Sequence, residues 1–244
     1  MSEMELPLAG GRITPGVVRA GNTVRRPLKP NAGFVHALLQ HLERAGFQAA
    51  PRFLGIDERG REILSFIAGD VPPDLDEWSD AQLVAAAKLI RAFHDATLDF
   101  SGKGDAEVVC HGDLGPCNTV FVEGMPAALI DFDAARPGRR ADDLGYAAWL
   151  WLDMGNDELS ARAVGRRLAL FSAAYGCSNA RNAVAWVKAA QRALLAGLAP
   201  GGGDTEHLRR VSAWAGNCLR WVESHEPALL EAIGEWQNGR AGSV

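Results

Sequence analysis

Four polar residues surround two short apolar runs between Cys110 and Asp133, where the chain reads CHGDLGPCNTVFVEGMPAALIDFD. They are His111, Asp113, Asn118 and Asp131. Residues 119–123 and 127–130 each have the composition of a β-strand, and Gly-Met-Pro at 124–126 predicts a turn between them. An antiparallel hairpin brings the start of its first strand beside the end of its second. We therefore expect Asn118 and Asp131 to lie close together at the open end of this hairpin.

A carboxamide and a carboxylate that converge in this way offer hard oxygen ligands to a metal ion. Mg²⁺ is commonly bound by one or two such protein ligands together with substrate phosphates. Asp113 precedes Asn118 by five residues, and Asp131 follows Asn118 by thirteen. Kinase catalytic loops have this order and this Asp-to-Asn spacing, because one Asp accepts the proton of the attacking hydroxyl while the Asn and a later Asp hold the metal. The pattern predicts Asp113 as the catalytic base and Asn118 and Asp131 as metal ligands.

The wording of these motifs closely resembles one family. HGDLGPCN at 111–118 is similar to the HGDxHxxN loop of the aminoglycoside phosphotransferase and choline kinase group, and IDFD at 130–133 resembles its ID-[FW]-[DE] metal segment. DDLGY at 142–146 resembles the D-L-[AG] element that follows. The resemblance implies an ATP-dependent phosphotransferase that moves the γ-phosphoryl group to a hydroxyl of a small molecule, with ATP and Mg²⁺ as cofactors. It also implies that His111 and Asp143 brace the catalytic loop and that Asp133 supports a second ion or the acceptor.

The same resemblance implies an α+β, protein-kinase-like fold of two lobes. A reduced N-terminal β-lobe, residues 1–68, would bind the nucleotide, and a mainly helical C-terminal lobe, residues 69–244, would hold the catalytic loop and the acceptor site. Helical periodicity at 34–45 and after Asp133 agrees with this division. A capping box at 79–82 predicts the start of another long helix, and the remaining helices are expected at 142–154, 157–175, 180–198 and 206–225.

The nucleotide contacts of the β-lobe are carried over from the family by position. Two β-rich runs around Gly21-Asn22 predict a hairpin at 16–26. The family's phosphate-binding Lys falls within Thr-Val-Arg-Arg-Pro at 23–27, so Arg25, or alternatively Arg26, would take its role; a solvated charge on an exposed strand is the other interpretation. Strands at 52–56 and 62–66 lead into Leu-Ser-Phe-Ile-Ala-Gly, which resembles the hinge, so the backbone of Ser65 and Ile67 would contact adenine.

Two features of the β-lobe depart from the family pattern. Gly10-Gly11 resembles what would remain of a phosphate-covering glycine loop, no G-x-G-x-x-G is present, and a simple turn is the other interpretation. The helix at 34–45 resembles the one whose Glu pairs with the strand Lys, but that Glu falls at Val35 or His36, so we expect the usual ion pair to be absent. A non-catalytic ligand-binding or immunity protein on the same scaffold is therefore an alternative function.

A second alternative class is an Asp-nucleophile phosphohydrolase, because Leu-Ile-Asp-Phe-Asp at 129–133 resembles a strand that ends in D-x-D. That pattern has Thr or Val where this chain has Ala135, and it leaves HGDLGPCN unexplained. It is the least favoured interpretation.

Composition limits the partners. The chain has 244 residues, of which 48% are hydrophobic and 23% charged, enough for one large domain or two lobes. The net charge of −5 does not favour a nucleic-acid partner. We expect no signal peptide or membrane helix, and four cysteines without a CxxC pair are typical of a cytoplasmic protein. The acceptor stays open among antibiotics, choline, homoserine and sugars, because a fold does not choose its substrate.

Overall fold

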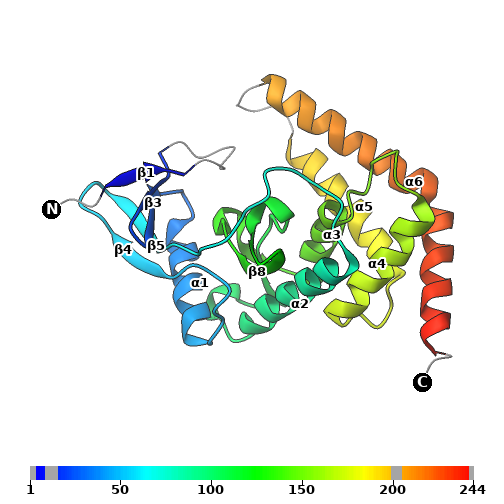
Figure 1. The fold of residues 1–244 in the computed structure, drawn as a ribbon, viewed down its shortest axis with the longest axis horizontal. Helices are drawn as coiled ribbons and strands as arrows, with labels where there is room; N and C mark the ends of the chain where they lie inside the picture. Colours follow the sequence, from blue (N-terminus) through cyan, green and yellow to red (C-terminus); the bar gives the residue numbers. More distant parts are fainter. Residues whose placement is uncertain (1–3, 9–15, 199–204, 242–244) are drawn as a thin grey trace. The chain divides into compact units, whose positions relative to one another are not determined.

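The computed structural model describes residues 4–8, 16–198 and 205–241 of the chain. It consists of two compact units (Figure 1). We call Met1–Asp74 with Leu89–Arg139 the sheet unit, and Leu75–Lys88 with Arg140–Val244 the helical unit. In the described parts of the chain, no helix combines the length and the apolar character that a membrane crossing requires.

The sheet unit begins with a five-stranded antiparallel sheet in the order β1-β2-β3-β5-β4. Its strands are β1 (Glu5–Pro7), β2 (Val18–Ala20), β3 (Thr23–Pro27), β4 (Phe53–Ile56) and β5 (Arg61–Ser65). The hairpin predicted around Gly21-Asn22 joins β2 to β3, and the two strands predicted near 52–56 and 62–66 are β4 and β5. The sequence pattern did not predict β1, which is only three residues long and lies at the sheet edge.

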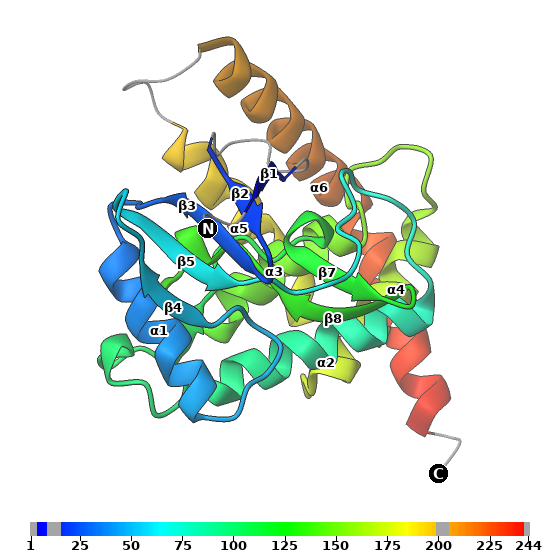
Figure 2. The ribbon, with the colours of Figure 1, turned by 60° about the vertical axis from the view of Figure 1, so that its left-hand side comes forward.

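The two faces of this sheet carry different side chains. Residues directly opposite each other in antiparallel strands share a face, and so do residues two apart in one strand. The pairings therefore place six residues on one face, which we call the inner face: Leu6, Arg19, Val24, Arg26, Glu62 and Leu64. Arg25 lies on the opposite face. Helix α1 (Ala32–Arg44) lies along the sheet (Figure 2), and its His36 ring stacks on Phe53 of β4 with centroids 3.8 Å apart.

The predicted catalytic hairpin is present as β7 (Thr119–Val122) and β8 (Met125–Leu129). Its turn differs from the prediction, because the chain reverses at Glu123 and Gly124 rather than at 124–126. Both residues have positive φ, 51° and 75°. That conformation is typical of a type I′ turn, whose twist matches the flanking strands. Met125 and Pro126 consequently belong to β8.

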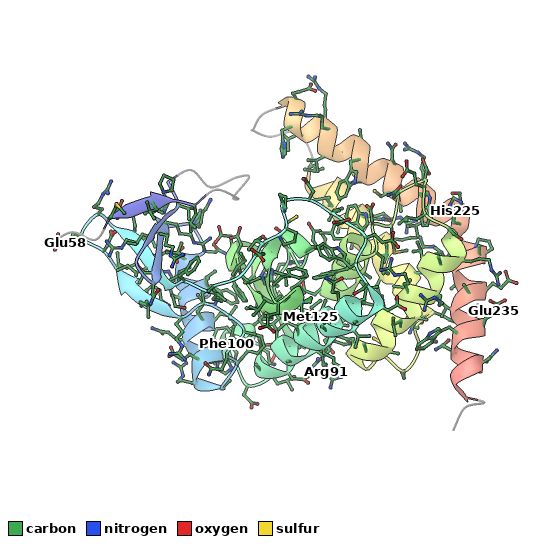
Figure 3. All side chains as sticks on the ribbon, in the orientation of Figure 1. Glu58, Arg91, Phe100, Met125, His225 and Glu235 are labelled. Carbon is green, nitrogen blue, oxygen red and sulfur yellow. The ribbon has the colours of Figure 1, made fainter. Side chains whose placement is uncertain are left out.

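Three 3-10 helices, one short strand pair and part of a long helix complete the sheet unit. The 3-10 helices are η1 (Ser101–Lys103), η2 (Pro116–Asn118) and η3 (Phe132–Ala134). The strand pair is β6 (Val108–Cys110) with β9 (Arg136–Gly138). The prediction of only helices after Asp133 was wrong at β9, because Arg-Pro-Gly carries no strand signal of its own. Helix α2 (Asp80–Ala96) ends in this unit, and Phe100, which is labelled in Figure 3, follows it. The Phe100 ring packs edge-on against Phe34 of α1, with centroids 5.7 Å apart.

The helical unit contains the start of α2 together with α3 (Arg140–Trp151), α4 (Ala161–Tyr175), α5 (Asn182–Gly197) and α6 (Thr205–Ala241). The predicted capping box is confirmed, since Ser79 N donates to Gln82 Oε1 at 2.8 Å and Gln82 N donates to Ser79 Oγ at 3.3 Å. Helix α3 packs on α5, and both α4 and α5 pack on α6. At the first contact, a side chain on Gly145 would overlap the Trp186 carbonyl.

Helix α6 is longer than the predicted 206–225 and continues through Pro227 to Ala241. A proline inside a helix removes one backbone hydrogen bond and crowds the preceding turn. The apolar stripe nevertheless resumes beyond it, where Leu229, Ala232 and Ile233 are buried. Burial of this stripe explains why the helix does not end at the proline.

Candidate functional site

The predicted base and one predicted metal ligand are hydrogen-bonded to each other. Asn118, at the end of η2, donates through Nδ2 to Asp113 Oδ2 at 2.7 Å and to the Asp113 carbonyl at 2.9 Å. These bonds fix the orientation of the amide, so that Oδ1 is the atom of Asn118 left to act as a metal ligand. The Asn118 carbonyl accepts a hydrogen bond from Ile130 N at 3.0 Å. The open end of the hairpin therefore holds Asn118 beside the residue that precedes Asp131.

His111 braces this loop from within the core. It is completely buried, and its Nε2 lies 3.0 Å from the Ile130 carbonyl. Its Nδ1 accepts a hydrogen bond from Asp113 N at 3.4 Å. A neutral ring with its proton on Nε2 satisfies both contacts. The adjacent Gly112 has φ of 83°, and a side chain there would crowd the Ala134 carbonyl, so this position requires glycine.

Asp131 has an unusual backbone conformation. It follows β8 and begins η3 with φ of 62° and ψ of 65°, in the left-handed region. Asp and Asn enter this region more readily than most residues, and such strained positions are concentrated at functional sites. The Asp131 side chain is 43% exposed and that of Asp133 is 25% exposed.

Arg26, rather than Arg25, reaches these carboxylates. Its NH1 donates to Asp131 Oδ1 at 2.9 Å and its NH2 to Asp133 Oδ1 at 2.6 Å. Its Nε donates to Glu62 Oε1 at 2.6 Å. Burial alone would lower the pKa of Arg26, but the surrounding carboxylates, Glu62 first, outweigh it and leave the pKa raised. Burial also raises the pKa of Asp133 against the opposing effect of Arg26.

Glu62 is the functional candidate that the sequence reasoning missed. It lies directly opposite Arg26 in the pairing of β3 with β5, and its second oxygen, Oε2, is 2.8 Å from His36 Nε2. The helix Glu expected by resemblance is absent, as predicted. A buried cation–carboxylate pair is nevertheless present, and its carboxylate lies on β5 instead of on the helix. Inward-facing charges on two neighbouring strands were the available signal.

The other residues predicted to bind the nucleotide lie on the sheet and in the hinge segment. Arg25 lies on the opposite face of the sheet from Arg26, and its NH1 is 4.0 Å from Glu5 Oε1. Ser65 N donates to the Arg52 carbonyl at 2.9 Å, so a contact between Ser65 and a base would have to use the Ser65 carbonyl. Ile67 follows in the hinge segment, which pairs with β7 through Asp70 and Phe121. Gly10-Gly11 lies outside the described residues.

Asp143 is buried in α3, and its predicted role in bracing the catalytic loop stays a prediction.

The donor set fits Mg²⁺. Asn118 Oδ1 and the Asp131 carboxylate are hard oxygen atoms on adjoining segments of the hairpin, and they would be the residues that hold the ion. Among the described residues, no group of three or more His, Cys, Asp or Glu side chains could hold a metal ion by itself. Such a sparse set is typical of Mg²⁺ that is bound together with substrate phosphates.

Comparison with known proteins identifies the family. The model of the phosphotransferase enzyme family matches residues 32–187, which is more than half of the chain. The chain belongs to the phosphotransferase enzyme family. The match includes both HGDLGPCN and IDFD, and the family resemblance expected from these motifs is confirmed.

One sequence relative and two solved structures are similar to this family member over most of its length. The trifolitoxin immunity protein of Rhizobium leguminosarum bv. trifolii is 33% identical over 258 residues, which cover 92% of this chain and 96% of the relative. Macrolide 2'-phosphotransferase MphH from Brachybacterium faecium aligns with a TM-score of 0.55 at 18% identity, over 82% of this chain and 87% of its own. The streptomycin–ATP–APH(2'')-IIa ternary complex gives 0.56 at 11% identity, over 94% of each chain. These structures confirm the kinase-like α+β fold.

Proposed function

We propose that this phosphotransferase-family member transfers the γ-phosphoryl group of ATP to a hydroxyl of a small molecule. The observation that supports the proposal most strongly is the hydrogen-bonded pair of Asp113 and Asn118 at the end of the hairpin that also presents Asp131. A base and two metal ligands are among the protein groups that phosphoryl transfer needs.

In this proposal Asp113 accepts the proton of the acceptor hydroxyl. Its carboxylate is oriented by Asn118, and its backbone is held by His111. A base that is held in place before the substrate arrives lowers the barrier to proton transfer. Asn118 and Asp131 would hold Mg²⁺, which when bound neutralises the charge on the transferring phosphoryl group.

The inner face of the sheet supplies a surface for the nucleotide. Leu6 and Arg19 line a shallow cavity of about 480 Å³ together with Met4 and Gly21. The Arg19 guanidinium lies 3.8 Å from the centroid of the Phe66 ring, so apolar side chains and one cation meet here, a combination that suits a purine.

Arg26 would bind the phosphates of a nucleotide whose base lies in this cavity. It is two residues, or about 7 Å, along β3 from Val24, which pairs with Arg19. This distance is compatible with a nucleotide whose base lies on the cavity and whose phosphates reach Arg26. Ser65 and Ile67 stay the candidate adenine contacts, and Arg25 stays the alternative phosphate contact.

The test is ADP release from Mg²⁺-ATP by the purified protein with a panel of aminoglycosides, amino alcohols and sugars. We expect turnover with at least one acceptor. Arg26→Gln should raise the KM for ATP and lower kcat together, whereas Arg25→Gln, a matched change on the opposite face, should alter neither. Equal losses in both variants would contradict the assignment of Arg26.

A non-catalytic immunity protein is the second candidate. It is favoured by the name of the relative from Rhizobium leguminosarum bv. trifolii and by the ion pairs that Arg26 already forms with Asp131 and Asp133. Either candidate would act in the cytoplasm, where the four cysteines, none of which forms a disulfide in the described part of the chain, would remain reduced. Absence of ADP release with every acceptor, and of any melting-temperature shift with millimolar ATP, would favour this second function.

A further inference from the structure

Glu62 is a buried carboxylate with a partner for each oxygen. The residue is 1% exposed, Oε1 accepts from Arg26 Nε at 2.6 Å, and Oε2 lies 2.8 Å from His36 Nε2. A carboxylate removed from water is strongly unfavourable unless it is paired and hydrogen-bonded. Glu62 of β5 thus links Arg26 of β3 to His36 of α1, and both of these partners are needed to keep the carboxylate buried.

The bond from Arg26 Nε determines where the rest of the guanidinium points. The group is planar, and its nitrogens form a fixed fork. With Nε held by Glu62, the NH1–NH2 edge faces Asp131 and Asp133 at 2.9 and 2.6 Å. Rotation of the side chain would move this edge away from the carboxylates and break the 2.6 Å bond to Glu62. Glu62 therefore sets the direction of the cation.

His36 connects this arrangement to α1. Its ring is stacked nearly parallel on Phe53, with an interplanar angle of 14°, which holds Nε2 toward Glu62. The acidic residue of α1 is Glu43, in the last turn, where its Oε1 lies 3.4 Å from Arg52 Nε. The helix therefore reaches the cation through a histidine and a strand carboxylate rather than through a carboxylate of its own.

We propose that Glu62 and His36 are positioning residues that aim Arg26 at the phosphates of the bound nucleotide, an inference that rests on the proposed function. Three carboxylates, Glu62, Asp131 and Asp133, surround one guanidinium, so the cluster carries surplus negative charge when they are ionised. That surplus suits a divalent cation arriving with the nucleotide. Phosphate oxygens would then meet N–H groups whose direction Glu62 has already fixed.

The deciding variants move the carboxylate between strand and helix. Glu62→Gln keeps the shape but removes the charge, and we expect it to weaken Mg²⁺-ATP binding in calorimetry and to lower kcat, each by about tenfold or more. His36→Glu combined with Glu62→Gln returns a carboxylate from the helix side and should recover most of both losses. Glu43→Gln, the same change at a carboxylate of α1 outside this cluster, should behave as wild type. Wild-type ATP affinity and turnover in Glu62→Gln would overturn the inference.

A second measurement separates this inference from the proposed function. The Arg26 Nε–H resonance, assigned by its loss in Arg26→Lys, should be protected from solvent exchange in the wild type and unprotected in Glu62→Ala, which removes the acceptor that an amide at this position would keep. If the wild type binds no Mg²⁺-ATP, the proposed function fails; separately, an Arg26 signal still protected in Glu62→Ala would overturn the positioning. If Glu62→Gln does not fold, Glu62→Asp replaces it. This change moves the carboxylate away from Arg26 by one methylene, and we expect the same losses of Mg²⁺-ATP affinity and of kcat.

Discussion

Replacement of Asp113 by Asn tests catalysis separately from stability. Asn118 Nδ2 donates to Asp113 Oδ2 at 2.7 Å, and the amide oxygen of the new residue can accept the same bond. The bond changes from charge-assisted to neutral, which should cost about 0.5–1.5 kcal/mol of unfolding free energy. The amide cannot accept the hydroxyl proton, however, so kcat should fall about 10²- to 10⁴-fold, or about 2.7–5.4 kcal/mol in activation free energy.

The assay measures ADP release with the acceptor found in the panel, alongside Mg²⁺-ATP affinity and thermal unfolding of each variant. ATP affinity should stay within about threefold of wild type, because Asp113 acts on the acceptor. Asp99→Asn is the matched control, since Asp99 is an exposed residue of the same unit. Turnover by Asp113→Asn at the wild-type rate would refute the role of Asp113 as base.

Three further outcomes are expected. Asp131→Ala should abolish the part of ATP affinity that depends on Mg²⁺; equal wild-type affinity in calorimetry with and without Mg²⁺ would contradict the metal site. Gln191 of α5 is fully buried, and neither amide atom has a hydrogen-bond partner in the described part of the chain, so Gln191→Leu should raise the unfolding free energy by about 1–3 kcal/mol in urea titration, whereas Gln191→Ala should lower it. Hydrogen bonds from Arg61 lower the pKa values of Glu5 and Asp57, so both carboxylates stabilise the fold above about pH 4 and lose that effect as they protonate. Thermal unfolding between pH 3 and 7 should therefore show a steeper acid loss for the wild type than for Arg61→Gln, and parallel curves would contradict this.

The parts of the fold that sequence predicts well are those with a local signal. The hairpin at Gly21-Asn22, the capping box at Ser79 and the helix at 34–45 each depend on residues within a few positions of one another. Strand β9 and the end of α6 depend on distant partners instead. Arg136–Gly138 is a strand because β6 pairs with it, and α6 passes Pro227 because its next turns are buried against the other helices.

The residues of the site also divide into those that a local signal predicts and those that depend on distant partners. Asp113 and Asn118 lie five residues apart in one loop, so a local spacing identified both as candidates, and the structure joins them by a hydrogen bond. Arg25 and Arg26 are adjacent, and only the pairing of β3 with β5 decides which side chain faces Asp131. The contact between Arg26 and Glu62 joins residues 36 positions apart. A motif read along the chain does not contain that information, because it arises when two strands come into register.

The position of the Arg26 partner also limits which single changes the site can tolerate. Opposite residues in an antiparallel pair are about 5 Å apart on one face, so β5 can supply a carboxylate to a β3 cation as directly as a neighbouring helix can. A buried Glu62 then needs a donor for its second oxygen, which His36 provides. Loss of His36 alone leaves that oxygen unpaired, and loss of Glu62 alone leaves Arg26 without the bond that orients it. A carboxylate transferred to α1 must therefore be accompanied by neutralisation of Glu62, because two buried carboxylates side by side would repel each other.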